Sequence, residues 1–276
     1  MFDFAKDSLK NAVNHKLRFS GVCIAFQPIV DASSLRVWGY EALTRGAEGQ
    51  SYPAMIAGMD ERRRKAFDKL TAAKAIREAS HLGLLRHGAK LTLNVRPTVD
   101  LTAVDAAFVA RAAKHYGVPL ASLVLELTED ATLSCEDFKK VMELHRSVGI
   151  ATGIDDFGAG YSGLNVLATC GAAMVKLDQQ LIRGIDTDTK KQIIVEAFTQ
   201  LCEKLGSLVV AEGVETHAEA ETLRDQGVEL MQGYYFGRPV VGAQPVLPHG
   251  ITEVGTKRRW GSSPMKSWGQ TVRMRA

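Results

Sequence analysis

The sequence predicts an α/β fold, a TIM-like (β/α)8 barrel whose opening strand runs antiparallel to the strand after it. Eight short apolar segments of strand type recur along the chain, and amphipathic segments of helical period separate most of them. The chain has 276 residues, close to the length of about 250 residues that such a barrel needs. An open doubly wound sheet is the alternative, but no glycine-rich dinucleotide fingerprint follows an early strand.

The opening segments set the predicted topology. Residues 1–20 carry apolar side chains at helical spacing, so we expect a short helix packed on the domain. Residues 22–30 and 35–43 read as strands, and the polar linker between them is short enough for a hairpin, which makes these two strands antiparallel.

The rest of the chain alternates between two kinds of segment. Short runs rich in Val, Ile and Leu, mostly preceded by glycine or a turn, are typical of buried parallel strands. We expect such strands at residues 90–95, 123–127, 150–154, 173–177, 208–211 and 228–231. Helical periodicity predicts helices over residues 62–82, 103–116, 136–148, 189–205 and 217–226.

Charge is distributed unevenly along the chain. The 23 residues from Val254 onward hold six basic residues and no acidic ones, and their Gly, Ser and Arg content predicts disorder. Subtracting these six charges from the net +3 leaves −3 for residues 1–253, so nucleic-acid binding by the core is not indicated. We therefore expect one domain over residues 21–250 and a basic tail over residues 251–276, whose partner is unknown.

The chain shows no sign of export. No run of about 18 apolar residues is present, which argues against a membrane span, and the N-terminus does not resemble a signal peptide. The four cysteines are far apart in the sequence and suggest neither a disulfide framework nor a structural zinc site. These features favour a cytoplasmic protein.

Polar side chains follow the apolar part of seven successive predicted strands. One carboxylate after a strand is most often a helix cap or a solvated loop residue, but seven such positions in succession indicate a shared site. The carboxyl ends of barrel strands open on one face, where such folds hold their active sites. In chain order these residues are Glu41, Asn94, Glu126 with Glu129, Asp155 with Asp156, Lys176 with Asp178, Glu212 with Glu215, and Gln232.

Five acids converging on one face need opposite charge. Two carboxylates about 4 Å apart repel by about 4 kcal/mol at an effective dielectric constant near 20. Two divalent cations and the Lys176 ammonium would balance five carboxylates, and the oxygen-only ligands favour Mg²⁺ or Mn²⁺ over zinc. A two-metal oxygen site suits in-line phosphodiester hydrolysis, although it does not identify the substrate. The five acids are Glu41, Glu126, Asp155, Asp156 and Glu212.

Eight sequence blocks between Phe26 and Pro239 carry a family resemblance. In order they read FQPIV, GYEALTR, LNV, LELTE, DDFGAGYSGL, VKLD, AEGVET and QGYYFGRP. The chain thereby resembles the EAL phosphodiesterase family, which is named for the tripeptide found here at residues 41–43. The resemblance implies a metal-dependent enzyme of bacterial second-messenger signalling that hydrolyses cyclic di-GMP to linear pGpG, commonly as a homodimer.

The resemblance also implies a role at each matching position. Lys176 would orient or deprotonate the hydrolytic water, with Glu41 and Asp155 as further catalytic residues, and Glu129 would stabilise the loop after the paired aspartates. One metal would be held by Glu41, Asn94, Glu126 and Asp155, and the second by Asp155, Asp156 and Glu212. The implied substrate-binding residues are Gln27, Leu43, Arg45, Glu215, Gln232, Phe236 and Pro239, with Arg45 as a phosphate partner.

Four positions depart from the pattern of the family. Gly46 stands where many members have Trp, and Arg96 replaces a common Ser after the metal-binding Asn. Ala159 and Gly163 replace Thr and Ser in the loop after the aspartates. None of these changes removes a metal ligand or the lysine, so they bear on substrate affinity and loop ordering.

Two other functions are compatible with parts of the sequence. A catalytically inactive receptor could bind cyclic di-GMP and act through protein partners, but inactive members usually lack metal ligands that this chain keeps. A class I aldolase-like barrel could use Lys176 as a Schiff-base nucleophile, but five neighbouring carboxylates would keep its amine protonated.

Overall fold

The computed structural model describes residues 21–96, 104–128, 134–158, 163–248 and 251. The helix predicted over residues 1–20 and nearly all of the basic tail lie outside the described residues, as do Glu129 and Ala159.

In the described part of the chain, nine strands form one sheet, and eight of them close into a barrel. Strands β2 to β8 follow one another in parallel, and β1 closes the ring by pairing antiparallel with both β2 and β8. The predicted barrel with an antiparallel opening strand is therefore confirmed. The strands are β1 (Cys23–Asp31), β2 (Arg36–Arg45), β3 (Lys90–Asn94), β4 (Leu123–Thr128), β5 (Ala151–Phe157), β6 (Met174–Leu177), β7 (Leu208–Ala211), β8 (Leu230–Met231) and β9 (Val240–Val241).

The β1–β2 turn shows why these two strands pair as a hairpin. The Asp31 side chain accepts hydrogen bonds from the backbone N–H groups of Ser33 and Ser34, at 3.0 and 2.8 Å. Leu35 then takes a left-handed conformation with φ 51°, which reverses the chain within four residues. The hairpin places Gln27 directly opposite Glu41.

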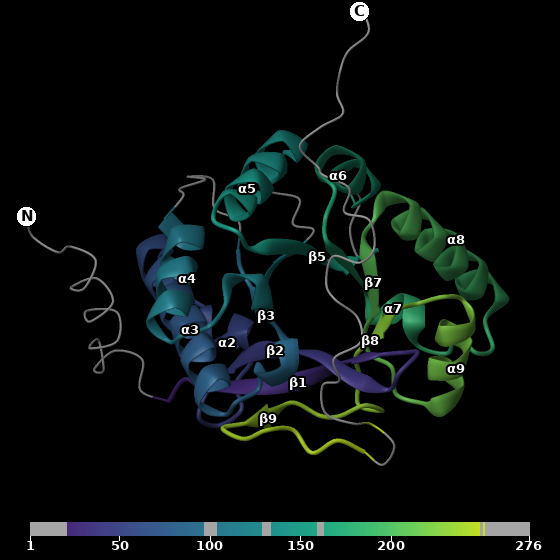
Figure 1. Ribbon diagram of the computed structural model, residues 1–276, viewed down its shortest axis with the longest axis horizontal. Helices are drawn as coiled ribbons and strands as arrows, with labels where there is room; N and C mark the ends of the chain where they lie inside the picture. Colours follow the sequence, from purple (N-terminus) through teal and green to yellow (C-terminus); the bar gives the residue numbers. More distant parts are fainter. Residues whose placement is uncertain (1–20, 97–103, 129–133, 159–162, 249–250, 252–276) are drawn as a thin grey trace, which may run out of the picture.

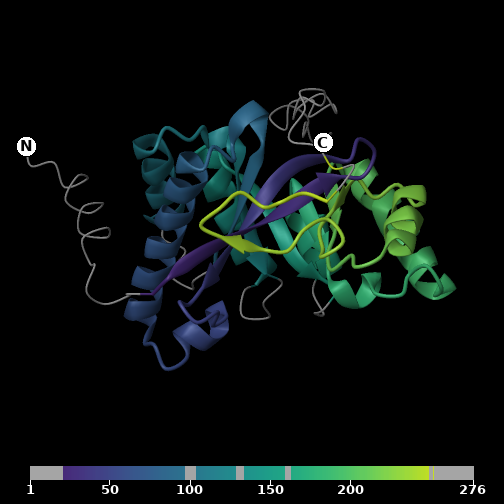
Figure 2. The same cartoon turned by 90° about the horizontal axis from the view of Figure 1, so that it is seen from below.

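Helices surround most of the barrel (Figure 1). The side between α9 and α3 is instead covered by the β9 segment, which lies along the outside of β1 (Figure 2). None of the described helices is both long and apolar enough to cross a membrane. The helices are α2 (Tyr52–Ile56), α3 (Glu61–His81), α4 (Val104–His115), α5 (Cys135–Ser147), α6 (Gly163–Cys170), α7 (Gln179–Ile182), α8 (Thr189–Leu205) and α9 (His217–Asp225), with single 3₁₀ turns at Arg86–Gly88 and Leu120–Ser122.

All five predicted helices are present, within a few residues of their expected ends. Helix α8 spans the predicted residues because Asp188 caps its first turn and the left-handed Gly206, with φ 75°, ends it. Helices α2, α6 and α7 were not predicted, since each is too short to show a helical period.

Apolar side chains inside the barrel form a floor beneath the predicted site. Side chains alternate between the two faces of a strand, so the residue two places before an inward-facing residue also faces inward. Val124, Met174, Val210 and Leu230 precede Glu126, Lys176, Glu212 and Gln232 in this way, and they pack together with Ile29 in one buried cluster. The larger apolar clusters lie between the barrel and its helices.

Candidate metal centre and active site

The ammonium group of Lys176 is surrounded by four carboxylates, three from the carboxyl-terminal halves of β2, β4 and β5 and one from the residue after β7. Its Nζ atom lies 2.6 Å from Glu212, 3.0 Å from Asp155, 3.4 Å from Glu126 and 3.5 Å from Glu41. The lysine side chain is 1% exposed and Glu126 is fully buried. The predicted gathering of acids around this lysine is therefore present in the fold.

Burial and charge set the protonation of this cluster. Burial would lower the pKa of Lys176, but the surrounding carboxylates outweigh it and raise that pKa well above its usual value, so the amine is an ammonium. Burial raises the pKa of Glu126 well above normal, and it raises the pKa of Glu212 to about 8, although Lys176 opposes both shifts. One lysine is thus too little positive charge for this many acids.

Glu41 is held by hydrogen bonds as well as by the lysine. Its two carboxylate oxygens accept from the side-chain amides of Asn94, at 2.7 Å, and Gln232, at 2.6 Å. Gln232 also donates to Gln27 across the barrel closure. Burial acts to raise the pKa of Glu41, but Lys176 and these hydrogen bonds together lower it, so Glu41 is ionised.

The backbone at the end of β5 brings two successive aspartates to the same site. In a regular strand, Asp155 and Asp156 would point to opposite faces. Here Asp156 has a left-handed φ of 55°, and the pairing of β5 with β6 shifts register between Ile154 and Phe157. Such strain in a residue other than glycine is often found at functional sites. Burial and the neighbouring Asp155 raise the pKa of Asp156.

The carboxylates fall into two groups with the geometry of metal ligands. Glu41, Glu126 and Asp155 form one, Asp155, Asp156 and Glu212 form the other, and within each group one oxygen per residue lies within 4.8 Å of the others. Within the described residues, one buried oxygen of Glu126 accepts no hydrogen bond, and the Asp155 oxygen in its group faces only the Lys176 ammonium, at 3.0 Å. A buried carboxylate oxygen without a donor, next to acids of raised pKa, fits two divalent cations that share Asp155. Asn94 lies beside the first group through its hydrogen bond to Glu41.

A cavity of about 440 Å³ opens beside this cluster. Asn94, Asp155 and Asp156 line it, as do Leu43 and Arg45, two of the predicted substrate-binding residues. The Arg45 guanidinium donates to the Thr44 carbonyl oxygen at 2.9 Å. Further polar residues of the cavity wall had no predicted binding role, among them Tyr52, Asp68 and Arg96.

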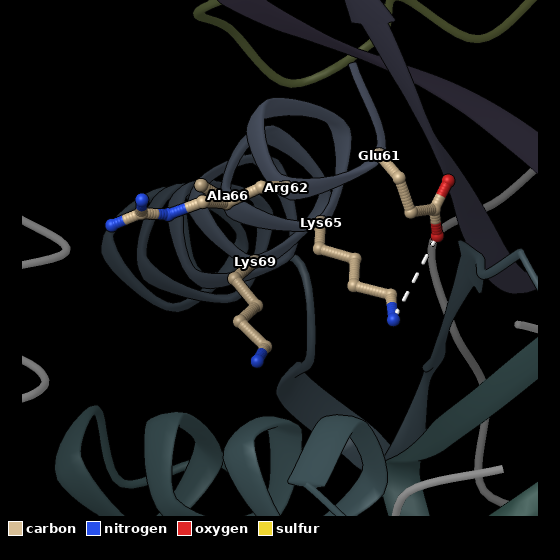
Figure 3. A pocket seen from close by; sticks show the side chains of 5 residues that line it. All are labelled: Glu61, Arg62, Lys65, Ala66 and Lys69. Atoms are coloured by element: carbon tan, nitrogen blue, oxygen red, sulfur yellow. Dashed lines mark ion pairs between the residues drawn. The ribbon is translucent and has the colours of Figure 1, made fainter. Parts of the chain in front are cut away.

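A second depression lies on the surface of α3 and is lined by Glu61, Arg62, Lys65, Ala66 and Lys69 (Figure 3). The close view shows a side of a helix whose charged side chains extend outward, with Lys65 paired to Glu61 at 3.8 Å. Exposed pairs of this kind contribute little to stability, and none of the predicted site residues lines this depression.

The residues of this site lie within the part of the chain that resembles known proteins. A family model described as EAL domain matches residues 8–239. The chain belongs to the EAL domain family. The family tripeptide Glu41-Ala42-Leu43 lies on β2, where Glu41 faces the lysine inside the barrel and Leu43 reaches the cavity.

Curated relatives match one part of longer proteins. The probable cyclic di-GMP phosphodiesterase PdeN of Escherichia coli K12 is 32% identical over 224 residues, which is 79% of this chain and 43% of that protein. The blue light- and temperature-regulated antirepressor BluF of the same organism is 27% identical over 225 residues, covering 81% of this chain and 55% of BluF. The chain thus spans about half or less of the length of these two relatives.

Three solved structures resemble the fold closely. A standalone EAL protein of Vibrio cholerae O395, in its cyclic di-GMP-bound form, matches with a TM-score of 0.79 and 38% identity, covering 85% of this chain and 98% of the other. The calcium and cyclic di-GMP complex of Klebsiella pneumoniae BlrP1 matches with a TM-score of 0.76 and 34% identity, covering 83% and 58%. Its manganese complex at pH 9.0 matches with a TM-score of 0.74 and 33% identity, covering 84% and 60%.

The other predicted substrate-binding residues lie in different surroundings. Gln27 and Gln232 are buried in the hydrogen-bond network of Glu41. Glu215 is exposed and pairs with Arg183 at 2.6 Å. Phe236 is only 1% exposed and belongs to the apolar core, so its ring is closed off from solvent in this conformation. Pro239 is half-buried just before β9.

Proposed function

We propose that this EAL domain is a divalent-metal-dependent phosphodiesterase that hydrolyses cyclic di-GMP to linear pGpG, with its catalytic domain over residues 21–250. The proposal is carried by two clusters of three carboxylate residues that share Asp155 and lie at the edge of a nucleotide-sized cavity. PdeN and the structures with bound cyclic di-GMP support the choice of substrate.

The ligand oxygens define where the cations would be held. Glu41, Glu126 and Asp155, with Asn94 beside them, would hold one ion, and Asp155, Asp156 and Glu212 the other. Two Mg²⁺ or Mn²⁺ ions would supply Lewis acidity and a nucleophilic water at neutral pH. Because Glu212 has a pKa of about 8, it would lose its proton when the second cation binds.

Lys176 acts as a hydrogen-bond donor in this proposal. In the metal-free cluster its raised pKa makes it an ammonium, which has three N–H donors and no acceptor. As an ammonium it would orient the hydrolytic water, which is one of the two roles implied by the resemblance. Its Nζ atom contacts carboxylates from both proposed sets of cation ligands, so the water that it would orient lies between the two cation positions. Arg45 and Leu43 would contact the substrate on the cavity side.

The test is a product assay. The purified protein is incubated with cyclic di-GMP in Mg²⁺ or Mn²⁺, with a matched sample in EDTA, and the nucleotides are separated by chromatography. The proposal expects pGpG in the metal samples and unchanged substrate in EDTA. Binding of cyclic di-GMP without product would contradict the enzyme and support a receptor, an activity of the kind suggested by the regulatory name of BluF.

A further inference from the structure

The cavity beside the metal ligands extends away from the barrel axis to a wall built by α2 and α3. Apolar side chains of Leu43, Pro53, Ala72 and Leu93 form much of its surface. A cavity of about 440 Å³ lies within the range of nucleotide and cofactor sites, which are mostly apolar and carry a few polar groups that fix orientation. A flat aromatic base suits such a surface better than a phosphate does.

Three polar side chains of this wall bond to one another, from α2, from α3 and from the segment after β3. The Tyr52 hydroxyl donates to Asp68 Oδ1 at 2.5 Å, and the same hydroxyl oxygen accepts from Arg96 Nη2 at 3.0 Å. The Arg96 guanidinium also lies 5.5 Å from the centre of the Tyr52 ring. Asp68 on α3 therefore orients Tyr52 on α2, and Tyr52 orients the arginine that follows β3.

The Arg96 guanidinium keeps most of its donors available. A guanidinium carries five N–H donors, and within the described residues Arg96 makes one hydrogen bond and no ion pair with a carboxylate. The side chain is half-buried and lines the cavity two residues after Asn94. A half-buried, oriented fork of donors at the wall of this cavity suits a planar pair of acceptors.

We propose that Arg96 is a specificity-determining residue that reads the O6 and N7 edge of one guanine of the substrate, with Tyr52 as its positioning residue. Guanine presents two acceptors on this edge, which match the arginine fork, whereas adenine presents one acceptor and one donor. Lysine has no such fork, so charge alone does not replace the arginine. This inference rests on the proposed function and adds to it a base-selective contact at a position that departs from the family pattern.

The experiment compares cyclic di-GMP with cyclic di-AMP in Arg96→Met, Arg96→Lys and Tyr52→Phe. The control is Arg86→Met, because Arg86 is an exposed arginine just before β3, at the opposite end of the strand that Arg96 follows. Turnover is measured in Mg²⁺, and the dissociation constant is measured separately by calorimetry in Ca²⁺. Thermal melting verifies that each variant is folded.

Arg96→Met is expected to raise KM and Kd for cyclic di-GMP about tenfold or more with kcat nearly unchanged, and to reduce the preference over cyclic di-AMP by the same factor. Arg96→Lys should recover little of the lost affinity and preference. Tyr52→Phe should raise KM and Kd by a smaller factor, and Arg86→Met should leave both unchanged.

Three results with the Arg96 variants would overturn the inference. An equal loss of affinity for both dinucleotides would assign Arg96 to the phosphates. Unchanged KM and Kd would show that it does not touch the substrate. A fall in kcat alone would make its role structural.

A wild type that binds but does not hydrolyse cyclic di-GMP would refute the proposed function, while the Ca²⁺ binding data would still test Arg96. A wild type that binds neither dinucleotide would refute both.

Discussion

The Nζ atom of Lys176 lies 2.6 Å from a carboxylate oxygen of Glu212, the shortest of its four ion pairs. Both proposed sets of cation ligands contribute carboxylates that surround this lysine. Glu41 and Glu126 belong to the first set and Glu212 to the second, and Asp155 belongs to both. A single buried ammonium thus holds both sets of ligands in place without metal. It also makes the cluster dependent on that charge.

Replacing Lys176 should separate chemistry from binding. Lys176→Met keeps the length of the side chain but removes the donor, so we expect the rate of cyclic di-GMP hydrolysis to fall about 100-fold or more while binding in Mg²⁺ is retained. The lost charge should also lower the melting temperature in EDTA, because four acids then repel one another, and Mn²⁺ should restore it. Lys90→Met is the control, since Lys90 is a buried lysine that bonds to the Ala121 carbonyl outside the cluster. Wild-type turnover in Lys176→Met would remove the lysine from the mechanism.

Asp155→Asn should abolish metal binding at both positions. Asp155 is the one carboxylate common to the two groups, and an amide offers a neutral oxygen in place of a charged one. Calorimetry with Mn²⁺ should detect no tight site, and the product assay no pGpG. Asp178→Asn is the matched control, because Asp178 belongs to neither group and caps α7, a role that Asn also performs. One intact Mn²⁺ site in Asp155→Asn would show that the aspartate is not shared.

The choice of metal should follow coordination geometry. Mg²⁺ and Mn²⁺ should support hydrolysis, whereas Ca²⁺ should bind and support little turnover, because its longer and more flexible coordination misplaces the reacting water. Initial rates at saturating concentrations of each ion measure this. Equal rates in Ca²⁺ and Mg²⁺ would contradict the two-cation arrangement.

His145 should make the fold sensitive to acid. Its ring is buried, its Nδ1 atom lies 2.9 Å from Thr152 Oγ1, and burial lowers its pKa to about 4. The unfolded chain, with an ordinary pKa near 6.5, binds the proton more readily, so this contribution to stability is complete above pH 6.5 and is lost as the pH falls toward 4. The loss amounts to about 3 kcal/mol.

Urea unfolding between pH 4 and 7.5 measures this effect. His145→Gln, which cannot be protonated, should show a shallower decline in the free energy of unfolding over that range. If the variant and the wild type declined in parallel, the histidine would not be the group that titrates.

Much of the barrel could be predicted from the sequence because its signals are local. The apolar strand segments, the polar linker of the β1–β2 hairpin and the helical period of α8 each act within a few residues, and all three predictions were confirmed. The site could be anticipated for a related reason. Parallel strands deliver their carboxyl ends to one face, so the polar residues at those ends were expected to meet, and the ion pairs of Lys176 show that the central ones do.

Other features depended on contacts between distant parts of the chain. The bond from Gln232 to Gln27 joins residues 205 positions apart and exists only because the ring closes. The left-handed backbone of Asp156, the burial of Phe236 and the bridge from Asp68 through Tyr52 to Arg96 have no signature in local periodicity. The sequence by itself determined which residue types reach the mouth of the barrel. Only the tertiary structure decided which atoms touch there. Hydrogen bonds and ion pairs form over about 3 Å. The spacing of the strands and the packing of side chains set distances on this scale, whereas the spacing of residues along the sequence does not.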